Sequence, residues 1–174
     1  MIPTPLPTEF TLNRTNLTWQ EVRYGHARKW LGWKDVANVA IKKIQRKAEI
    51  GQVEIELSEL TKETAWRVSE LLDRIASSET PEAESDIRRK WLFIVLNWLY
   101  ENQSSYEDPL REVEVVYAEF DYPEEMKSFV RFLPPSDGYR PQDHSKEENV
   151  ARIFDLWRRF IELNRAMYLP DDEG

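Results

Sequence analysis

The hydrophobic pattern of this chain is most pronounced over residues 91–100, which are all apolar or aromatic except Asn97. A helix that is apolar on every side must be covered on every side by other elements. We therefore predict a central helix over residues 81–102, with Thr80 as its N-cap and Pro81 as its first residue. Asn97 is expected to hydrogen bond to the end of a neighbouring helix, because a buried amide needs partners for both of its polar atoms.

Apolar positions elsewhere follow the three-to-four-residue spacing of amphipathic helices. Thr18 with Glu21 and Ser145 with Glu148 form capping-box patterns, each of which predicts the start of a helix. The first of these helices is expected to end near a C-cap at Gly32, and the second at Tyr168. Further helices are predicted over residues 33–48, 62–77 and 109–120, followed by a short one after Pro123. The pattern predicts an all-α, single-domain bundle of about seven helices, whose antiparallel pairs could stack like a solenoid.

Four segments do not show helical spacing. Residues 51–60 alternate apolar and polar side chains as a strand does, but no second strand is available to pair with them, so an extended linker or a short helical turn is expected. Residues 1–16 contain prolines at positions 3, 5 and 7, which favour an extended arm laid over the domain. Residues 134–144 read as a loop, and the acidic tail 170–174 is expected to fray.

Composition restricts the chemistry that the chain can perform. The 174 residues include no cysteine, so disulfides and cysteine-ligated metals are excluded. The beginning of the chain lacks the pattern of a secretory signal, and the apolar run is too short for a membrane span of about 20 residues. We therefore expect a soluble cytoplasmic protein that does not insert into membranes.

Candidate catalytic residues are few. The chain has two histidines, of which His26 lies on the apolar stripe of a predicted helix and His144 lies beside Asp143 at a helix start. Neither has the spacing of a metal site, and no glycine-rich phosphate loop or nucleophile motif is present. We expect a binding protein without cofactor or metal. An enzyme using carboxylates with His26 or His144 is the alternative. A structural helical protein that dimerises through exposed aromatic residues is a third interpretation.

The net charge of −8 is unevenly distributed, because residues 101–125 carry nine acidic groups and a single arginine while residues 1–50 carry a net charge of +5. A basic stretch over residues 42–47 lacks interleaved aromatics, so a solvated face or an internal contact is favoured over nucleic-acid binding. The acidic segment has two interpretations: a solvated surface partly neutralised by the basic N-terminal region, or a surface that recognises a basic protein partner, which is our leading hypothesis. The residues expected to face that partner, with two tyrosines as aromatic anchors, are Glu112, Glu114, Glu119, Asp121, Tyr122, Glu124, Glu125 and Tyr139.

The same region resembles a bacterial protein family known only as a domain of unknown function. The likeness spans about residues 17–135 and lies in core aromatics and helix starts: Leu17-Thr18-Trp19 with Gly25, Lys90-Trp91-Leu92, Tyr100-Glu101-Asn102, Asp108-Pro109-Leu110, and residues 116–125 and 129–134. The resemblance implies a fold rather than an activity. Proteins of this size, acidity and compactness are similar to the immunity proteins that accompany bacterial toxins, and this analogy suggests an inhibitor of a basic toxin domain.

Overall fold

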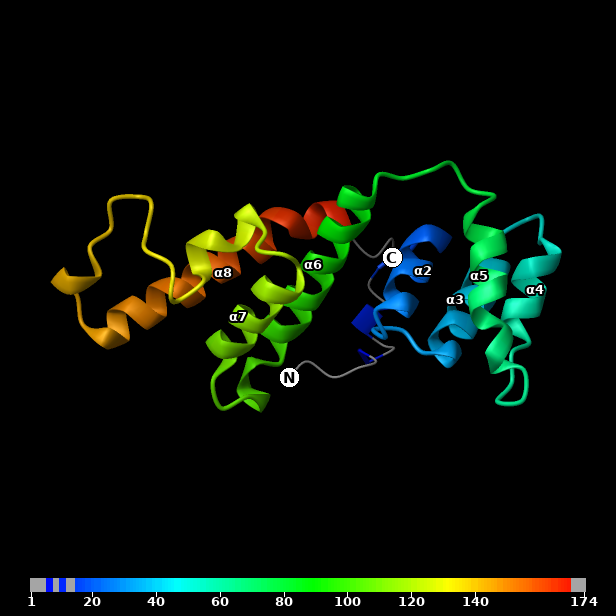
Figure 1. The fold of residues 1–174 in the computed structure, drawn as a ribbon, viewed down its shortest axis with the longest axis horizontal. Helices are drawn as coiled ribbons and strands as arrows, with labels where there is room; N and C mark the ends of the chain where they lie inside the picture. Colours follow the sequence, from blue (N-terminus) through cyan, green and yellow to red (C-terminus); the bar gives the residue numbers. More distant parts are fainter. Residues whose placement is uncertain (1–5, 8–9, 12–14, 170–174) are drawn as a thin grey trace. The chain divides into compact units, whose positions relative to one another are not determined.

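The computed structural model describes residues 6–7, 10–11 and 15–169, and these residues form helices without any strand. The all-α prediction is therefore confirmed. Contacts between the described residues divide them into a first unit, which ends at Trp91, and a second unit, which begins at Leu92. Helix α6 (Glu84–Glu101) contributes its beginning to the first unit and the rest of its length to the second (Figure 1).

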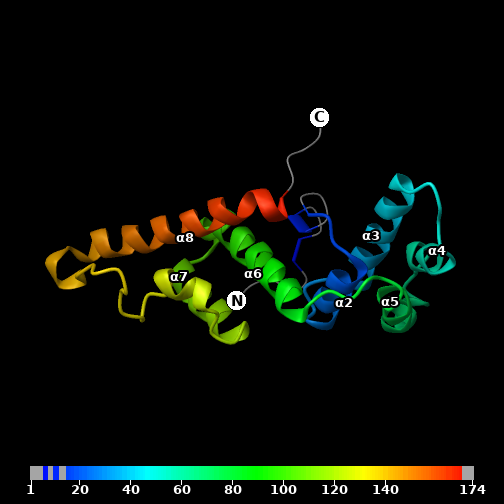
Figure 2. The same ribbon diagram turned by 90° about the horizontal axis from the view of Figure 1, so that it is seen from above.

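In the first unit, α2 packs against α5, and α4 packs against both α3 and α5 (Figure 2). Its elements are α2 (Trp19–Ala27), α3 (Trp33–Arg46), α4 (Gln52–Ser58), the 3-10 helix η1 (Ala65–Arg67) and α5 (Val68–Ala76). Helix α4 confirms the helical alternative for residues 51–60. It is helical because this conformation buries Leu57 and Glu54 together, and Glu54 finds polar partners in Lys47 and Trp19.

The second unit is built on aromatic packing between α8 and its neighbours. Its elements after α6 are the 3-10 helix η2 (Gln103–Ser105), α7 (Pro109–Glu119), the 3-10 helices η3 (Glu124–Phe129) and η4 (Pro141–Asp143), and α8 (Lys146–Tyr168). Trp157 of α8 is fully buried and its ring lies 5.1 Å from that of Tyr100, while Phe160 lies 5.3 Å from Phe129 of η3. The short helix predicted after Pro123 is thus present, as a 3-10 helix.

The predicted start of the central helix is wrong by three residues, because α6 begins at Glu84. The segment before it instead serves the beginning of α2. The Glu79 carboxylate accepts the N–H groups of Trp19 and Gln20, at 3.0 and 2.8 Å. The Gln20 side chain donates to the Thr80 carbonyl at 2.7 Å and accepts the Glu82 N–H at 2.9 Å. These tertiary bonds hold residues 79–82 outside any helix, despite the Thr-Pro pattern.

The helix that begins at Trp19 ends at Ala27, so the C-cap prediction for Gly32 is wrong. Lys29 instead adopts the left-handed conformation, with φ of 64°, and the Trp30 N–H returns to the Gly25 carbonyl at 3.0 Å. Gly32 is the N-cap of α3, and its N–H donates to the Asp35 carboxylate at 2.7 Å.

Two other helix boundaries also differ from the predictions. Helix α3 ends at Arg46 rather than at residue 48. The helix predicted over residues 62–77 begins at Ala65 as η1 and continues as α5. Before it, a turn closes when the Thr61 N–H donates to the Thr64 hydroxyl at 2.9 Å, which delays the first helical residue.

Asn97 is fully buried, but neither its amide nitrogen nor its amide oxygen has a hydrogen-bond partner among the described residues. The predicted bond to a neighbouring helix end is therefore wrong. Its neighbours Leu96 and Trp98 are buried as well, so apolar burial of the run determines the position of Asn97 at the expense of an unsatisfied amide.

The described part of the predicted arm lies on the first unit. Leu6 is 1% exposed and its N–H donates to the Trp30 carbonyl at 2.9 Å. Phe10 and Thr11 are helical where an extended backbone was predicted, because their N–H groups donate to the Pro7 carbonyl. The remainder of the arm, apart from residues 15 and 16, and the predicted tail 170–174 lie outside the described residues.

Candidate functional site

A concave acidic surface lies along one face of α7. We call it the acidic groove. It encloses about 750 Å³ and is lined by Glu107, Asp108, Arg111, Glu112, Val115 and Glu119. The residues from Asp108 onward lie three, four, seven and eleven positions after it, which places them on the same side of a helix. Four carboxylates and one guanidinium therefore line a single hollow, a composition suited to a cationic group.

The first residues of α7 and its N-cap form one end of the groove. Asp108 is the N-cap, and its carboxylate accepts the Arg111 N–H at 3.2 Å, while Pro109 occupies the first turn. Partial burial alone would raise the pKa of Asp108, but hydrogen bonds from the Arg131 guanidinium and the Arg111 N–H outweigh it and lower the pKa. Asp108 is therefore charged near neutral pH.

Arg131 pairs with Glu114, one of the acids predicted to face the partner. Its guanidinium lies 3.0 Å from Asp108 and 3.0 Å from Glu114, and so joins two carboxylates. Glu114 does not line the groove. Glu107 and Glu119, in contrast, are exposed to solvent. Glu107 and Glu119 therefore carry charge that a partner can reach in the groove.

The remaining predicted residues lie beyond the groove lining. Glu124 is paired with Lys127 at the start of η3, and Asp121 and Glu125 are exposed. Tyr122 is 60% exposed, and its ring lies 5.2 Å from that of Tyr117. The structure thus brings Glu112 and Glu119 together and places Tyr122 at the turn that follows α7.

Glu107 and Asp108 line the groove but are not among the residues predicted from the sequence. In the sequence Asp108 reads as a helix start, and Glu107 contributes only to the count of acids. The signal that could have found Asp108 is its helical spacing from Glu112 and Glu119, since a helix that begins at residue 109 places all three on one face.

Tyr139, the second predicted anchor, is half-buried and packed against its own surroundings. Its ring stacks on His144 with 4.6 Å between centroids, the Arg152 guanidinium lies 4.0 Å above it, and its hydroxyl donates to Asn149 at 2.6 Å. It lines a separate cavity of about 270 Å³ beside the beginning of α8. The structure therefore does not join Tyr139 to the acidic groove.

Neither histidine lines the acidic groove. His26 is half-buried in the first unit, and burial lowers its pKa. His144 Nδ1 lies 3.5 Å from Glu148 in the second unit. Within the part of the chain that the structure describes, no group of three or more His, Cys, Asp or Glu could hold a metal ion. In the same residues, no helix combines the length and apolarity that a bilayer crossing requires.

Comparison with known proteins identifies the family. The model of a family described as uncharacterised proteins conserved in bacteria, DUF2247, matches residues 8–165. This chain belongs to the DUF2247 family. The match covers the acidic groove and nearly all the described helices, and it confirms the resemblance noted from the sequence. No curated protein and no solved structure shows significant similarity to the chain. Membership of DUF2247 establishes the family without assigning a function to any residue.

Proposed function

We propose that this protein binds a basic protein partner through the acidic groove. The observation that carries the proposal is the lining of the groove, a hollow of about 750 Å³ whose described residues include four acids and a single base, Arg111. The acids are Glu107, Asp108, Glu112 and Glu119, of which Asp108 is also paired with Arg131. Like charges gathered on a concave wall cost stability through mutual repulsion, and a cationic partner would relieve that repulsion. Complementary charge also accelerates association and orients the partner.

An exposed aromatic residue beside the acidic segment supports a protein partner. Asp121 and Tyr122 both have left-handed backbone conformations, with φ of 62° and 58°. A bulky residue in this region is uncommon, since glycine would adopt the conformation at lower cost. Tyrosine is also enriched among the residues that dominate binding energies at interfaces. In this proposal Tyr122 is an anchor, and the contacts of its side chain with the partner offset the free energy lost to the left-handed backbone.

The most specific form of the proposal is an immunity-type inhibitor. In that form the partner is a toxin domain with a basic cleft, both proteins act in the cytoplasm, and the inhibitor works by occlusion. The protein needs no catalytic group for this role, because blocking a cleft requires only complementary shape and charge.

A charge-reversal experiment tests the groove. The variant Glu107→Lys/Glu119→Lys changes two exposed residues and turns a lining of four acids and one base into two acids and three bases. The matched control, Glu59→Lys/Glu63→Lys, makes the same charge change at two exposed residues of the first unit. A partner is first captured from host lysate on the unmodified protein at low salt. It is then purified and its affinity is measured for all three proteins.

We expect a basic partner whose affinity falls at least tenfold for the groove variant, a loss of about 1.4 kcal/mol. The control should bind within about threefold of the unmodified protein, and added salt should weaken binding because the contacts are ionic. Equal affinity for the groove variant and the control would remove the groove from the proposal.

Growth of bacteria that express the captured partner tests the immunity form separately. We expect the partner alone to arrest growth, and co-expression of the unmodified protein, but not of the groove variant, to restore it. A partner that binds the groove but does not affect growth would disprove the immunity form and leave protein binding in place.

A further inference from the structure

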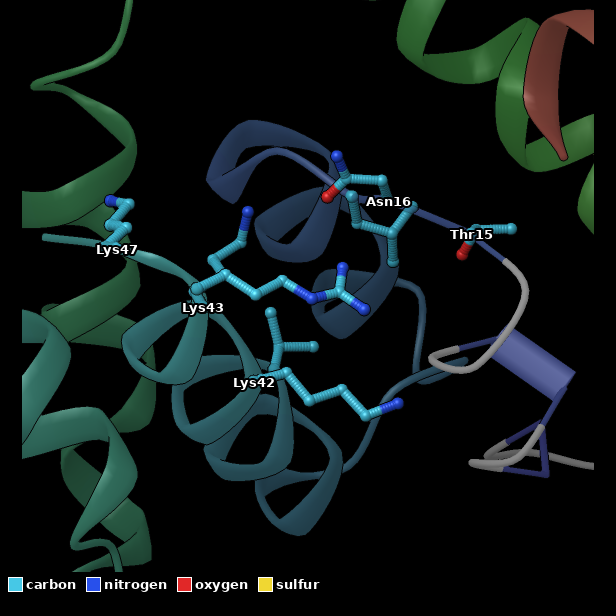
Figure 3. Close-up of a pocket in the computed structure, with 8 residues that line it drawn as sticks. Thr15, Asn16, Lys42, Lys43 and Lys47 are labelled. Atoms are coloured by element: carbon cyan, nitrogen blue, oxygen red, sulfur yellow. The ribbon is translucent and has the colours of Figure 1, made fainter. Parts of the chain in front are cut away.

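A second charged hollow, of opposite sign, lies in the first unit. We call it the basic cavity. It encloses about 230 Å³ and is lined by three cationic residues of α3, by a fourth at the C-cap of that helix, and by Thr15, Asn16, Leu17 and Val39. The cations are Lys42, Lys43, Arg46 and Lys47. Figure 3 shows Lys42 and Lys43 on α3, with Asn16 and Thr15 on the segment that passes beside it.

Lys47 is paired with a buried carboxylate of the same unit. Lys47 Nζ lies 2.5 Å from the Glu54 carboxylate, whose side chain is 5% exposed. Burial alone would raise the pKa of Glu54, but the hydrogen bond and charge of Lys47, assisted by Trp19 and Gly51, lower it. Glu54 is therefore ionised and holds Lys47 at the edge of the cavity.

No acidic residue is among the described residues that line the basic cavity. Two carboxylates that act on Lys43 from outside it, Glu79 and Glu21, already have other partners. Glu79 accepts the N–H groups of Trp19 and Gln20, and Glu21 is paired with Lys90 at 2.7 Å. The negative charge near the cavity is therefore used to complete the fold rather than to fill the hollow.

Lys43 is the most enclosed of these cations. Burial lowers its pKa, Glu79 opposes this shift, and the charge of Lys47 adds to it. Its ammonium group lies 5.5 Å from the centre of the Trp19 ring, which gives it one favourable contact. A half-buried ammonium in this position would be stabilised further by an anion in the cavity.

Helix electrostatics alone do not account for the arrangement. Cations in the last turn of a helix are modestly stabilised by the helix dipole, which favours Lys43 and Arg46. Like charges four residues apart, as at 42/46 and 43/47, are destabilising to a similar extent. These opposing effects are similar in size, and neither requires the cations to surround a hollow.

We propose that the basic cavity binds the phosphate groups of a small phosphorylated metabolite. Lysine and arginine donate charge-assisted hydrogen bonds that suit phosphate oxygens. The cavity is equivalent to roughly eight water volumes, more than one phosphoryl group needs. It is also slightly smaller than the roughly 300 Å³ at which pockets for drug-sized ligands begin. A diphosphate group therefore fits it best. This site lies in the first unit and does not depend on the acidic groove.

The test is calorimetric titration of the full-length protein with inorganic pyrophosphate, at an ionic strength held constant with sodium chloride. The variant Lys43→Gln/Arg46→Gln removes the most enclosed cation and its neighbour. The matched control, Lys34→Gln/Lys62→Gln, removes the same charge from two exposed lysines of the same unit. We expect one pyrophosphate per chain, binding at least tenfold more weakly to the cavity variant and within about threefold for the control.

Three results would overturn the proposal. The first is the absence of saturable binding to the unmodified protein, and the second is equal binding to a cavity variant that circular dichroism shows to be folded. The third concerns the source of the phosphate, since a short single-stranded oligoribonucleotide presents the same group. An oligoribonucleotide that displaces pyrophosphate and binds more tightly would identify a nucleic acid as the ligand. Should the double variant fail to fold, the single variant Lys42→Gln provides the same comparison, with weaker pyrophosphate binding expected and unchanged binding contradicting the proposal.

Discussion

Replacing Gly25 by alanine should destabilise the first unit through a steric clash. A Cβ atom at Gly25 would lie 2.2 Å from Cζ2 and 2.7 Å from Cη2 of Trp91, whereas ordinary contacts are 3.4–4 Å. Trp91 has no exposed surface, and its Nε1 donates to the Glu21 carbonyl at 2.9 Å. Its ring also packs 5.2 Å from that of Trp30. The indole must therefore move by about an ångström within a filled core.

The size of the effect follows from three contributions. Overpacking a core costs about 1–3 kcal/mol, and a displaced indole that loses its hydrogen bond costs a further 1–3 kcal/mol, roughly. Alanine recovers about 1 kcal/mol relative to glycine in a helix. The net loss in free energy of unfolding is about 3 kcal/mol. For a chain of this length, that loss corresponds to a fall in melting temperature of roughly 6–12 °C.

Thermal and urea unfolding followed by circular dichroism would measure this loss. Gly51→Ala is the matched control, because a Cβ there has no neighbour within 4 Å, and its stability should stay within about 1 kcal/mol of the unmodified protein. In a Trp91→Phe background the clashing indole atoms are absent, so Gly25→Ala should cost much less. A Gly25→Ala variant as stable as the Gly51→Ala control would refute the steric explanation.

Two further predictions concern buried charge and pH. Burial raises the pKa of Glu21 even though Lys90 pairs with it. Lys90→Met removes this partner and should lower the free energy of unfolding by about 3–5 kcal/mol near neutral pH. The folded variant then holds a proton that the unfolded chain releases above its ordinary pKa of 4.5, so urea titrations should show a smaller loss at about pH 5 than at about pH 8. A loss independent of pH would contradict this account. Burial lowers the pKa of His26, so unfolding takes up a proton and stability should fall as pH drops through 6.5. His26→Gln should reduce this dependence in the same assay, and an unchanged slope would assign it to other groups.

Local signals predicted helix starts correctly wherever the capping partners are close in sequence. Thr18 with Glu21 and Ser145 with Glu148 form the predicted capping boxes, because these hydrogen bonds join residues three apart. Thr80-Pro81 has comparable local features and failed, since the Thr80 carbonyl is used by Gln20, sixty residues earlier in the chain. Capping is predictable from sequence only when no distant partner competes for the same backbone groups.

The candidate site was predicted in composition but not in arrangement. The excess of acids over residues 101–125 is visible in the sequence, and helical spacing unites Glu112 and Glu119. The neutralisation of Glu114 by Arg131, seventeen residues later, depends on the return of the chain after η3. Tyr139 was expected to be an anchor, yet it packs against Arg152 and His144, one of which follows it by thirteen residues.

The sequence by itself determined the all-helical class, the central apolar run and the two charged segments. These features depend on side-chain periodicity and on interactions between residues three or four apart, both of which the local sequence sets without any distant contact. Only the tertiary structure decided which charges are neutralised and which line a hollow: Arg46 and Lys47 both line the basic cavity, and Lys47 is paired with Glu54 at its edge. The physical reason is that the energy of a charge depends on its burial and its nearest opposite charge, and packing sets both.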